Sequence, residues 1–414
     1  MRAMRAVAAA EMLGRLQARP DTARVLSALD AGSDAYVVGG TVRDLLLGLE
    51  PLDLDVVVEG PLAPALQALG APAREHGQFE TATVTVGMLR CDLARARAES
   101  YERPGALPDV RPASIEQDLR RRDFTVNAIA LGVAGARMGE LLDVPHATED
   151  LAAGRMRVLH DESFRDDPTR LLRLVRYASR LRFDIEPHTR ALVAHAVAVT
   201  ALRTVAAPRV GAELRLLGAE PDPVAALSGL TPLALDAAIA LGFGLDGPEP
   251  AAEALALLPA DGDPGALTLA VALSRVRDDD RGPLLLALGF EASQRDVILA
   301  TARLGPRLVV GLRHARAPSA IAAAVGSAPV EAVALAGALD ARSAAVRWIE
   351  WLRSVTLTIG GADLLAAGVP AGPAVGAALR AALRAKLDGR VQNRESELAE
   401  ALRAVRAHDG RAGG

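Results

Sequence analysis

The chain has 414 residues, a formal net charge of −4 and one cysteine, Cys91. A single thiol excludes intramolecular disulfides and a zinc cluster built on several thiolates, which favours a reducing, cytoplasmic location. The length allows about two to four domains. The net charge excludes a chain that is basic throughout, although a local basic stripe is enough to bind nucleic acid.

The first 20 residues predict a short amphipathic helix rather than a targeting peptide. Glu11 and Arg15 interrupt the alanine-rich stretch too early for the apolar core of such a peptide. No run of about 18 uncharged apolar residues is present anywhere in the sequence, so we predict no membrane span.

The residue pattern changes twice along the chain. Residues 35–131 mix short β-branched runs with glycine turns and helical stretches, whereas the pattern is helical from Asp161 onward and, beyond about Pro221, dominated by Ala and Leu. The predicted fold class is α+β. A mixed sheet with helices is expected in residues 1–150, followed by helical segments over 151–220 and 221–414.

The most informative segment combines a glycine turn with a pair of aspartates. Residues 39–44 read Gly-Gly-Thr-Val-Arg-Asp, and Asp53-Leu54-Asp55 follows nine residues later. The two-residue period of a strand places Asp53 and Asp55 on one face and the aliphatic set on the other, namely Leu52, Leu54, Val56 and Val58. Carboxylates that share one small volume raise each other's proton affinity unless cations lie between them, and the expected occupant is Mg²⁺. This combination is typical of nucleotidyl transfer.

Three consecutive arginines, Arg120 to Arg122, begin the second informative segment, which continues as Asp-Phe-Thr-Val-Asn-Ala to residue 128. An isolated arginine triplet is best interpreted as a solvated helix face. A bound triphosphate, however, needs at least one guanidinium fork. Arg122 lies next to the apolar residues that would anchor it and is the predicted phosphate ligand.

The third segment is Asp167-Pro168-Thr169-Arg170, where a proline at the first helical position predicts the start of a helix. Apolar residues form one stripe of this helix, and Arg170, Arg173 and Arg176 lie on the other face. One interpretation is an N-cap followed by solvent-facing arginines. The other is a base-reading site, because a carboxylate beside a guanidinium complements cytosine and adenine but not uracil or guanine.

Together these motifs resemble those of class II tRNA nucleotidyltransferases, the CCA-adding enzymes, in the bacterial poly(A) polymerase superfamily. The matching segments occur in the family's order and cover the first half of the chain, at residues 39–55, 121–128 and 167–176. Residues 361–373 resemble the family's tail pattern.

The resemblance implies a role for each matched position. The nucleotide-binding positions would be Gly40, Arg43, Arg122, Asp167, Arg170, Arg173 and Arg176. The catalytic, Mg²⁺-binding pair would be Asp53 and Asp55. A third metal carboxylate is plausible at Asp92 or at Glu99, and the sequence leaves this choice open.

The resemblance also implies a nucleotidyltransferase head over residues 1–150, a neck over 151–220 that binds base and RNA, and a body and tail over 221–414 that bind tRNA. Basic residues of the tail are candidates for the tRNA contact, with a solvated helix face as an equal alternative: Arg380, Arg384, Lys386, Arg390 and Arg394. No stable protein partner is implied.

The chain departs from the family's pattern at three places. Asp166 stands where most members have Glu, which shortens the reach of that carboxylate and puts the posture of Arg170 in doubt. The head–neck connection, residues 143–151, lacks the paired glycines of most members, which would stiffen it. Residues 206–213 replace a stretch of the neck that stabilises a helix in the family.

The implied activity is template-independent addition of C, C and A to the 3′ end of tRNA from CTP and ATP. The 3′ hydroxyl would attack the α-phosphate in line, assisted by two Mg²⁺ ions. Alternatives are a CC-adding or A-adding half-enzyme, a poly(A) polymerase and a non-catalytic RNA-binding module. Residues 99–118 keep the loop that full CCA addition requires in the family, which favours the complete activity.

Overall fold

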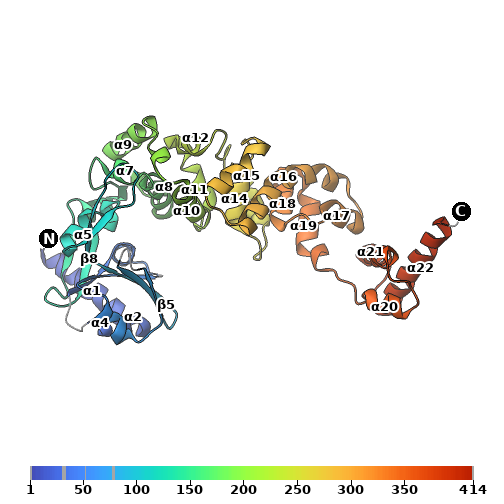
Figure 1. Cartoon of the computed structure of the whole chain (residues 1–414), viewed down its shortest axis with the longest axis horizontal. Helices are drawn as coiled ribbons and strands as arrows, with labels where there is room; N and C mark the ends of the chain where they lie inside the picture. The colour runs from blue at the N-terminus through green and yellow to red at the C-terminus, as the bar shows by residue number, and fades with distance from the viewer. Residues whose placement is uncertain (1, 30–33, 52, 77–79, 413–414) are drawn as a thin grey trace. The chain divides into compact units, whose positions relative to one another are not determined.

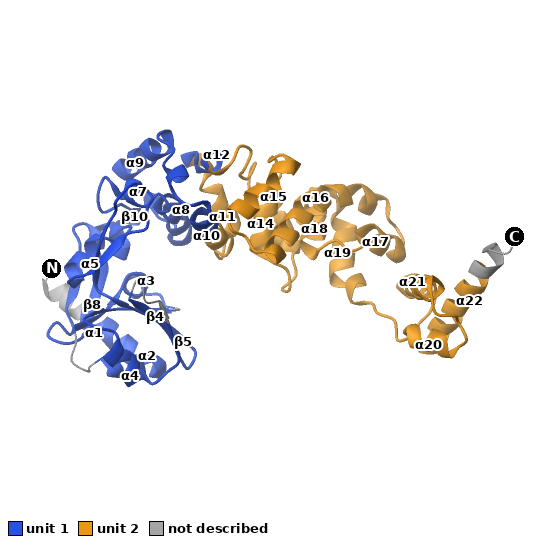
Figure 2. Cartoon of the chain, in the orientation of Figure 1, with its two compact units in different colours: residues 1–213, 233–238 blue, residues 214–232, 239–414 orange. Residues whose placement is uncertain are grey.

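The computed structural model describes residues 2–29, 34–51, 53–76 and 80–412. The chain forms two compact units, each coloured separately in Figure 2, and Figure 1 labels their helices and strands. The first unit contains Met1–Glu213 and Leu233–Ala238, and the second contains Leu214–Pro232 and Ile239–Gly414. The finer division at residues 150 and 220 stays a prediction.

A seven-stranded mixed sheet is the framework of the first unit. Its strands lie in the order β3-β4-β5-β2-β1-β8-β9. Their bounds are β1 Asp34–Val38, β2 Asp53–Glu59, β3 Ala73–His76, β4 Thr81–Val86, β5 Leu89–Arg95, β8 Ile129–Ala134 and β9 Leu141–Asp143. Strands β2 and β5 pair in parallel, whereas the other neighbours in this sheet pair antiparallel.

Strand β2 shows why the sequence folds this way. Leu54, Val56 and Val58 are at most 2% exposed and pack on the core side, as their spacing predicts, while Leu52 lies outside the described residues. Val57 is buried on the opposite face, so the strand is covered on both sides beyond Asp55. Asp53 and Asp55 therefore stand at the one end of β2 where polar groups have space.

Two short sheets and a set of helices complete the first unit. The sheets pair β6 Arg97–Ser100 with β7 Asp109–Pro112, and β10 Arg155–Met156 with β11 Asp184–Ile185. The helices are α1 Arg2–Gln17, α2 Pro20–Leu29, α3 Gly40–Leu46, α4 Ala63–Leu69, α5 Ile115–Arg120, η2 Thr125–Asn127, α6 Ala147–Ala153, α7 Ser163–Asp166, α8 Arg170–Leu181, α9 Pro187–Ala198 and η3 Ala201–Thr204. Helices α10 Ala207–Gly218 and α12 Leu235–Ile239 each cross a boundary between the units.

The described part of the second unit is helical, with no strand. Its other elements are α11 Pro223–Ser228, α13 Glu249–Leu257, α14 Pro264–Ala272, α15 Asp278–Ala287, α16 Ala292–His314, α17 Pro318–Val325, α18 Val330–Ala336, η5 Gly337–Ala341, α19 Arg342–Glu350, η6 Leu352–Ser354, α20 Gly361–Ala366, α21 Pro373–Leu387 and α22 Arg394–Ala412. The short helix η4 Thr231–Leu233 begins in this unit and ends in the first. The predicted α+β class, with a mixed sheet followed by helices, is confirmed.

One predicted helix boundary is wrong. The proline motif predicts a helix that begins at Pro168, but α7 ends at Asp166, Asp167 is extended, and α8 begins at Arg170 with Thr169 as its N-cap. The Asp167 carboxylate accepts hydrogen bonds from the backbone N–H of Thr169, at 3.1 Å, and from its hydroxyl, at 2.7 Å. These bonds end α7 and turn the chain before the next helix, which the proline rule does not anticipate.

The connection after β9 turns through a strained residue. His146 adopts a φ of +69° at the N-terminus of α6, a backbone conformation that glycine reaches at no steric cost. This is the segment in which the family's paired glycines are absent.

Among the described residues, no single helix is both long and apolar enough to cross a bilayer. One bent pair of helices passes the same test of length and composition, Pro318–Val325 with Val330–Ser354, at an angle of 114°.

The tail helices α20 to α22 have a small core of their own, formed by Ile359, Leu364, Val369, Ala378, Ala382 and Ala401. Leu364 is fully buried, whereas its neighbour Leu365 is 48% exposed. We expect Leu364→Ala to lower the free energy of unfolding of this region by about 2–5 kcal/mol, because it removes buried apolar surface and leaves a cavity.

Hydrogen exchange of the tail amides measures this effect, and Leu365→Ala is the matched control with an expected change below about 0.5 kcal/mol. Equal losses of protection in the two variants would contradict this core.

Candidate active site

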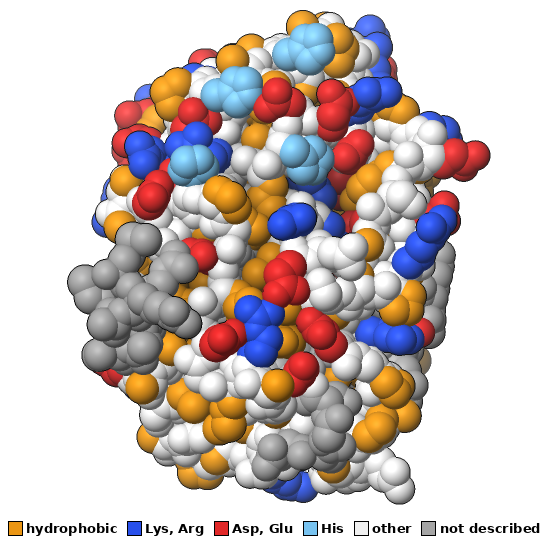
Figure 3. Space-filling view, turned by 90° about the vertical axis from the view of Figure 1, so that its left-hand side faces the viewer, with side chains coloured by type: hydrophobic (Ala, Val, Ile, Leu, Met, Phe, Trp, Pro, Cys, Tyr) orange, Lys and Arg blue, Asp and Glu red, His pale blue; other side chains and the backbone are white. Residues whose placement is uncertain are grey.

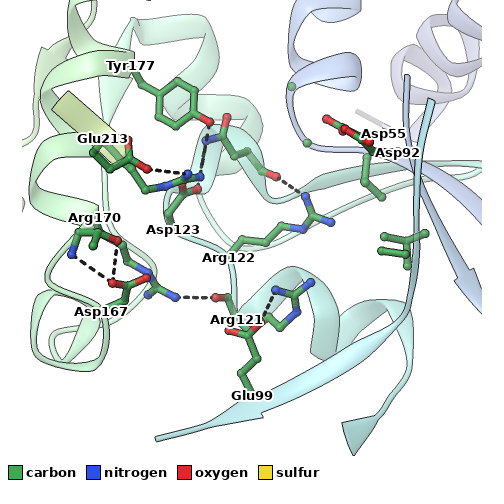
Figure 4. A pocket seen from close by; sticks show the side chains of 18 of the residues that line it. Asp55, Asp92, Glu99, Arg121, Arg122, Asp123, Asp167, Arg170, Tyr177 and Glu213 are labelled. Atoms are coloured by element: carbon green, nitrogen blue, oxygen red, sulfur yellow. Dashed lines mark hydrogen bonds and ion pairs between the residues drawn. The ribbon is translucent and has the colours of Figure 1, made fainter. Parts of the chain in front are cut away.

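A cavity of about 550 Å³ lies in the first unit, between the sheet and helices α8 and α10. Among the side chains labelled in Figure 4, Asp55 and Asp92 lie at one side, Asp167 and Arg170 lie at the other, and Arg121, Arg122 and Asp123 lie between them. Each of the three motifs thus contributes residues to one space, although Asp53 of the predicted metal pair is not among the residues that line it.

The register of the sheet determines where the acidic side chains of the cavity lie. Asp55 on β2 is directly opposite Asp92 on β5 in the parallel ladder, and both line the cavity. Asp53 lies two residues before Asp55 on β2 and is exposed. The Thr41 hydroxyl donates to the Asp53 carbonyl at 3.2 Å and accepts the Asp55 N–H at 3.0 Å, which fixes the start of β2 against α3.

The glycine turn allows this close packing. Gly39 has a φ of +63°, and a Cβ built on it would lie 2.8 Å from Arg122 Nη1 and 3.9 Å from Asp55 Oδ2. A Cβ on Gly40 would likewise lie 3.9 Å from Asp55 Oδ2. The backbone conformation at position 39 therefore favours glycine, and a Cβ there would also displace the Arg122 guanidinium.

The charged form of Asp55 is destabilised by its surroundings. Burial raises its pKa above the usual value, and the charges of Asp92 and Asp53 raise it further, while those of Arg122 and Arg43 act in the opposite direction. A bound cation would stabilise the charged form of Asp55 by compensating the negative charges of these carboxylates.

The donor set fits Mg²⁺ with waters and substrate oxygens in its shell. In the part of the chain that the structure describes, no group of three or more His, Cys, Asp and Glu side chains forms a ready metal site. Mg²⁺ commonly binds through one or two carboxylates and completes its shell with waters and phosphate oxygens. A pair of carboxylates beside an arginine-lined cavity meets that requirement.

The phosphate-binding candidate is held by a buried carboxylate. Asp118 on α5 has no exposed surface and accepts from Arg122 Nη2 at 2.9 Å and from Arg121 Nη2 at 2.7 Å. Its pKa is lowered: burial alone would raise it, but the charges and hydrogen bonds of these two arginines outweigh burial. Arg122 is thereby directed at the glycine turn and Asp55, whereas Arg121 turns towards Glu99.

Glu99, the other candidate for a third metal carboxylate, is already neutralised. Arg121 Nη1 lies 2.8 Å and Arg97 Nη2 lies 3.1 Å from Glu99 Oε1, and the Tyr101 hydroxyl donates to Oε2 at 2.9 Å. Asp92 accepts from Thr83 at 2.5 Å and from Arg90 at 3.1 Å, and it faces Asp55. The geometry therefore favours Asp92 over Glu99 as the candidate for the third metal-binding carboxylate.

Asp123 fixes the arginine face of α8. Its Oδ2 accepts from Arg173 Nη2 at 2.6 Å, and its Oδ1 accepts from Asn127 Nδ2 at 3.1 Å. Glu213 on α10 contacts the same face: it lies 3.5 Å from Arg173 Nη1 and accepts from Arg176 Nε at 3.2 Å. Arg173 lines the cavity with about a third of its side chain exposed.

The base-reading candidates lie on the same wall. Asp167 Oδ1 accepts from Thr169 and, at 3.0 Å, from Arg209 Nη2. Among the described residues, none donates to the other oxygen, Oδ2. Arg170 donates from Nη1 to Ser163 Oγ and from Nη2 to the Arg121 carbonyl, both at 2.8 Å. Asp167 and Arg170 each keep hydrogen-bonding capacity for a ligand.

Two of the arginines that are predicted to bind nucleotide are buried. Arg43 and Arg176 are 2% and 5% exposed. Arg43 donates to Asn127 Oδ1 at 2.8 Å and to Asp44, and both guanidinium groups pack over the Tyr177 ring, at 5.5 and 4.7 Å from its centroid. These positions support the wall of the cavity, and a direct contact with nucleotide stays a prediction for both. The alternative in which the α8 arginines are solvent-facing is wrong for Arg170 and Arg176.

The sequence motifs did not single out several residues that build the site. Thr41 and Asn127 lie inside the motifs and Tyr177 directly follows the third, but their roles depend on partners distant in the chain. Arg209 and Glu213 belong to the stretch that departs from the family's pattern, and they contact Asp167, Arg173 and Arg176 from α10. The sequence signal that could have indicated them is their spacing, because charged residues at positions i and i+4 lie on the same side of a helix.

The tail candidates for RNA binding differ in their surroundings. Lys386 Nζ lies 2.5 Å from Oε1 of the fully buried Glu397, which also accepts from the backbone and hydroxyl of Thr358, so this lysine has a structural partner. Arg394 pairs with Asp363, and Arg390 lies 3.7 Å from Glu400. Arg380 and Arg384 are exposed. Their binding to RNA stays a prediction.

The molecular face drawn in Figure 3 carries acidic and basic side chains interspersed with one another, in keeping with the net charge of −4. It offers no contiguous basic stripe among its described residues.

Comparison with known families assigns the N-terminal part of the chain to a class. Residues 35–157 match the family described as the poly A polymerase head domain. This part of the chain is therefore similar to that head domain, and the resemblance stated from the motifs is confirmed.

Several relatives of known name are tRNA nucleotidyltransferases. An A-adding tRNA nucleotidyltransferase of Halalkalibacterium halodurans is 45% identical over 205 residues, which cover 48% of this chain and 48% of the relative. A CC-adding tRNA nucleotidyltransferase of Deinococcus radiodurans is 44% identical over 200 residues, which cover 47% of this chain and 52% of the relative. The matched region spans about half the length of these relatives.

A solved CCA-adding enzyme of Thermotoga maritima, in complex with tRNA, matches at a TM-score of 0.75 and 26% identity over 96% of this chain and 98% of that chain. The likeness in fold thus extends through the helical second unit, where the sequence offers few landmarks.

The Asp123 carboxylate makes the folded first unit sensitive to acid. Burial alone would raise its pKa, but the charge of Arg173 and the hydrogen bonds of Asn127 and Arg173 lower it to about 2. The unfolded chain titrates near its ordinary value of about 4. The resulting stabilisation, about 2 kcal/mol, is fully present above a pH of about 4 and is lost as the pH falls towards about 2.

Urea denaturation across this pH range measures the effect. Asp123→Asn is expected to be less stable than the parent at neutral pH and to lack this part of the acid dependence. An unchanged acid dependence in the variant would contradict the assignment.

Proposed function

We propose that this chain is a tRNA nucleotidyltransferase that adds C, C and A to the 3′ end of tRNA, using CTP and ATP. The observation that carries the proposal is one cavity lined both by the facing carboxylates Asp55 and Asp92 and by the acceptor–donor pair Asp167 and Arg170. The first pair suits phosphoryl chemistry, and the second suits recognition of a base edge.

The reaction would be in-line attack of the tRNA 3′ hydroxyl on the α-phosphate, with pyrophosphate leaving. Asp53 and Asp55, with Asp92 as the third carboxylate, would hold Mg²⁺, which when bound supplies Lewis-acid stabilisation of charge on the phosphates. Arg122 would bind the triphosphate, because its Nη1 lies against the glycine turn and close to Asp55. Arg173 presents a second partly exposed guanidinium on the same cavity.

Base selection would follow from the polarity of the Asp167 and Arg170 pair. A free carboxylate oxygen accepts from the exocyclic amine of cytosine or adenine, and a guanidinium N–H donates to the neighbouring ring nitrogen. Uracil and guanine present the opposite order and would leave buried groups unpaired, at about 1–3 kcal/mol per group. The bonds from Arg209 and Thr169 to Asp167 Oδ1 hold the carboxylate in a single orientation.

The relatives support tRNA as the substrate, since their names and the solved complex refer to it. The candidates for tRNA contacts in this chain are the exposed tail arginines, foremost Arg380 and Arg384. Such contacts read shape and phosphates rather than sequence.

Half-enzymes are the strongest alternative, because the A-adding and CC-adding relatives are similar to this chain over about half of their length. The loop between β6 and β7 favours the complete activity, since the resemblance links this loop to full CCA addition and Tyr101 in it lines the cavity.

Primer extension on three tRNA transcripts, ending before CCA, after C and after CC, distinguishes these products. We expect CTP and ATP together to complete CCA and then stop, with no incorporation of UTP or GTP. Asp55→Asn should reduce the rate by at least about 100-fold, because it removes a carboxylate from the metal-binding pair while keeping its shape.

A halt at CC, or incorporation of A only onto the CC-ended transcript, would identify a half-enzyme, and a long A tail would identify a poly(A) polymerase. No incorporation on any transcript would contradict the catalytic proposal and leave an RNA-binding module.

Asp92 and Glu99 can be separated by the same assay. Asp92→Asn is expected to lower kcat by about 10-fold or more and to raise the Mg²⁺ concentration needed for half-maximal rate, because Asp92 faces Asp55. Glu99→Gln is the matched control, expected to leave the Mg²⁺ requirement unchanged. The reverse pattern would assign the third carboxylate to Glu99.

A further inference from the structure

Tyr101 is the first residue of the loop that joins β6 to β7, and its side chain lines the cavity together with Asp167 and Arg170. None of the sequence motifs assigns it a role. A partly buried tyrosine beside a candidate base site has two possible uses, as structural support for the loop or as a contact for the ligand.

The side chain is held from one side by a carboxylate network. The Tyr101 hydroxyl donates to Glu99 Oε2 at 2.9 Å, and Glu99 is itself fixed by Arg121 and Arg97. The Arg121 carbonyl accepts from Arg170 Nη2 at 2.8 Å. The tyrosine and the base-reading arginine are thus connected through Glu99 and Arg121.

The tip of the loop is anchored separately. The N–H of Gly105 donates to the Arg165 carbonyl at 3.3 Å, and its own carbonyl accepts from Arg209 Nη1 at 3.2 Å. A Cβ on Gly105, whose φ is +71°, would lie 2.5 Å from Thr204 Oγ1. The loop is therefore held at its tip as well as at Tyr101.

The hydroxyl is also electrostatically coupled to the base-reading pair. Burial raises the pKa of Tyr101 well above its usual value, Glu99 raises it further, and the charges of Arg170 and Asp167 act on it with opposite signs. The phenol therefore stays protonated at neutral pH and remains a donor to Glu99.

We propose that Tyr101 is a further base-contacting residue, whose ring is held by Glu99 as the wall against which a cytosine or adenine on Asp167 and Arg170 packs. In-plane hydrogen bonds select the edge of a base but leave its faces in water. An aromatic ring covers one face and excludes water, which strengthens the neighbouring hydrogen bonds. The proposal rests on the proposed function only in taking CTP and ATP as the ligands.

Equilibrium binding of CTP and of ATP, measured by isothermal titration calorimetry with Mg²⁺ and without tRNA, tests the proposal independently of catalysis. Tyr101→Ala is expected to raise the Kd for both nucleotides about 10-fold, whereas Tyr101→Phe, which keeps the ring, should stay within about threefold of the parent. Leu107→Ala is the matched control, because Leu107 belongs to the same loop and is 58% exposed. Its Kd should be unchanged.

Turnover gives a second readout. With tRNA, Tyr101→Ala should raise KM for the nucleotides with a smaller change in kcat, whereas a merely structural loop residue would lower kcat and leave nucleotide binding intact. An unchanged Kd in Tyr101→Ala, or equal losses in Tyr101→Phe and Tyr101→Ala, would overturn the proposal. A parent chain that binds CTP with the expected dependence on the ring but adds no nucleotide to tRNA would contradict the proposed function alone.

Discussion

The site depends on one buried carboxylate, Asp118, which receives the guanidinium groups of Arg121 and Arg122 on its two oxygens. A carboxylate with no exposed surface is costly unless it is paired, and removal of one partner from such a pair typically costs about 3–5 kcal/mol. The pairing therefore fixes both arginines. It sends Arg122 to the glycine turn beside Asp55, and it places Arg121 where its side chain binds Glu99 and its carbonyl binds Arg170.

The same principle extends around the cavity. Asp123 and Glu213 hold Arg173 and Arg176, and Arg209 holds Asp167, so opposite charges orient one another throughout the wall. A site preorganised in this way does not have to reorient its charges when a polyanionic substrate arrives, which is the main electrostatic advantage that a protein has over water. Asp55 is the exception: it lacks a direct arginine partner among the described contacts and carries a raised pKa. The uncompensated charge lies where a cation would bind.

The loop between β6 and β7 connects the phosphate side of the cavity with its base side. The start of the loop is held through Glu99 and its tip through Gly105. Arg209, which holds the tip, also binds Asp167. A rearrangement of the loop would therefore change the surroundings of the Asp167 oxygen that is proposed to read a base. This physical link offers a route by which one cavity could favour different bases at different steps.

The sequence by itself determined the class of fold and the residue types of the candidate site. The alternation in β2 places Asp53 and Asp55 on one face, the glycine pair predicts a tight turn, and the arginine motifs supply charge for phosphates, because these are local consequences of backbone periodicity and side-chain chemistry. Such local rules cannot specify which strand lies beside β2. The parallel pairing with β5 is a long-range choice, and it decided that Asp92 rather than Glu99 faces Asp55.

Tertiary structure likewise decided which of the α8 arginines are buried and which line the cavity. Helical periodicity places Arg170, Arg173 and Arg176 on one face of α8, but burial against α10 made Arg176 a supporting residue and left Arg173 on the cavity. The boundary of α8 was also decided by contacts, since the Asp167 side chain bonds the backbone that the proline rule assigns to the helix. Which charges meet depends on elements far apart in the chain, and the pattern within one helix carries no information about them.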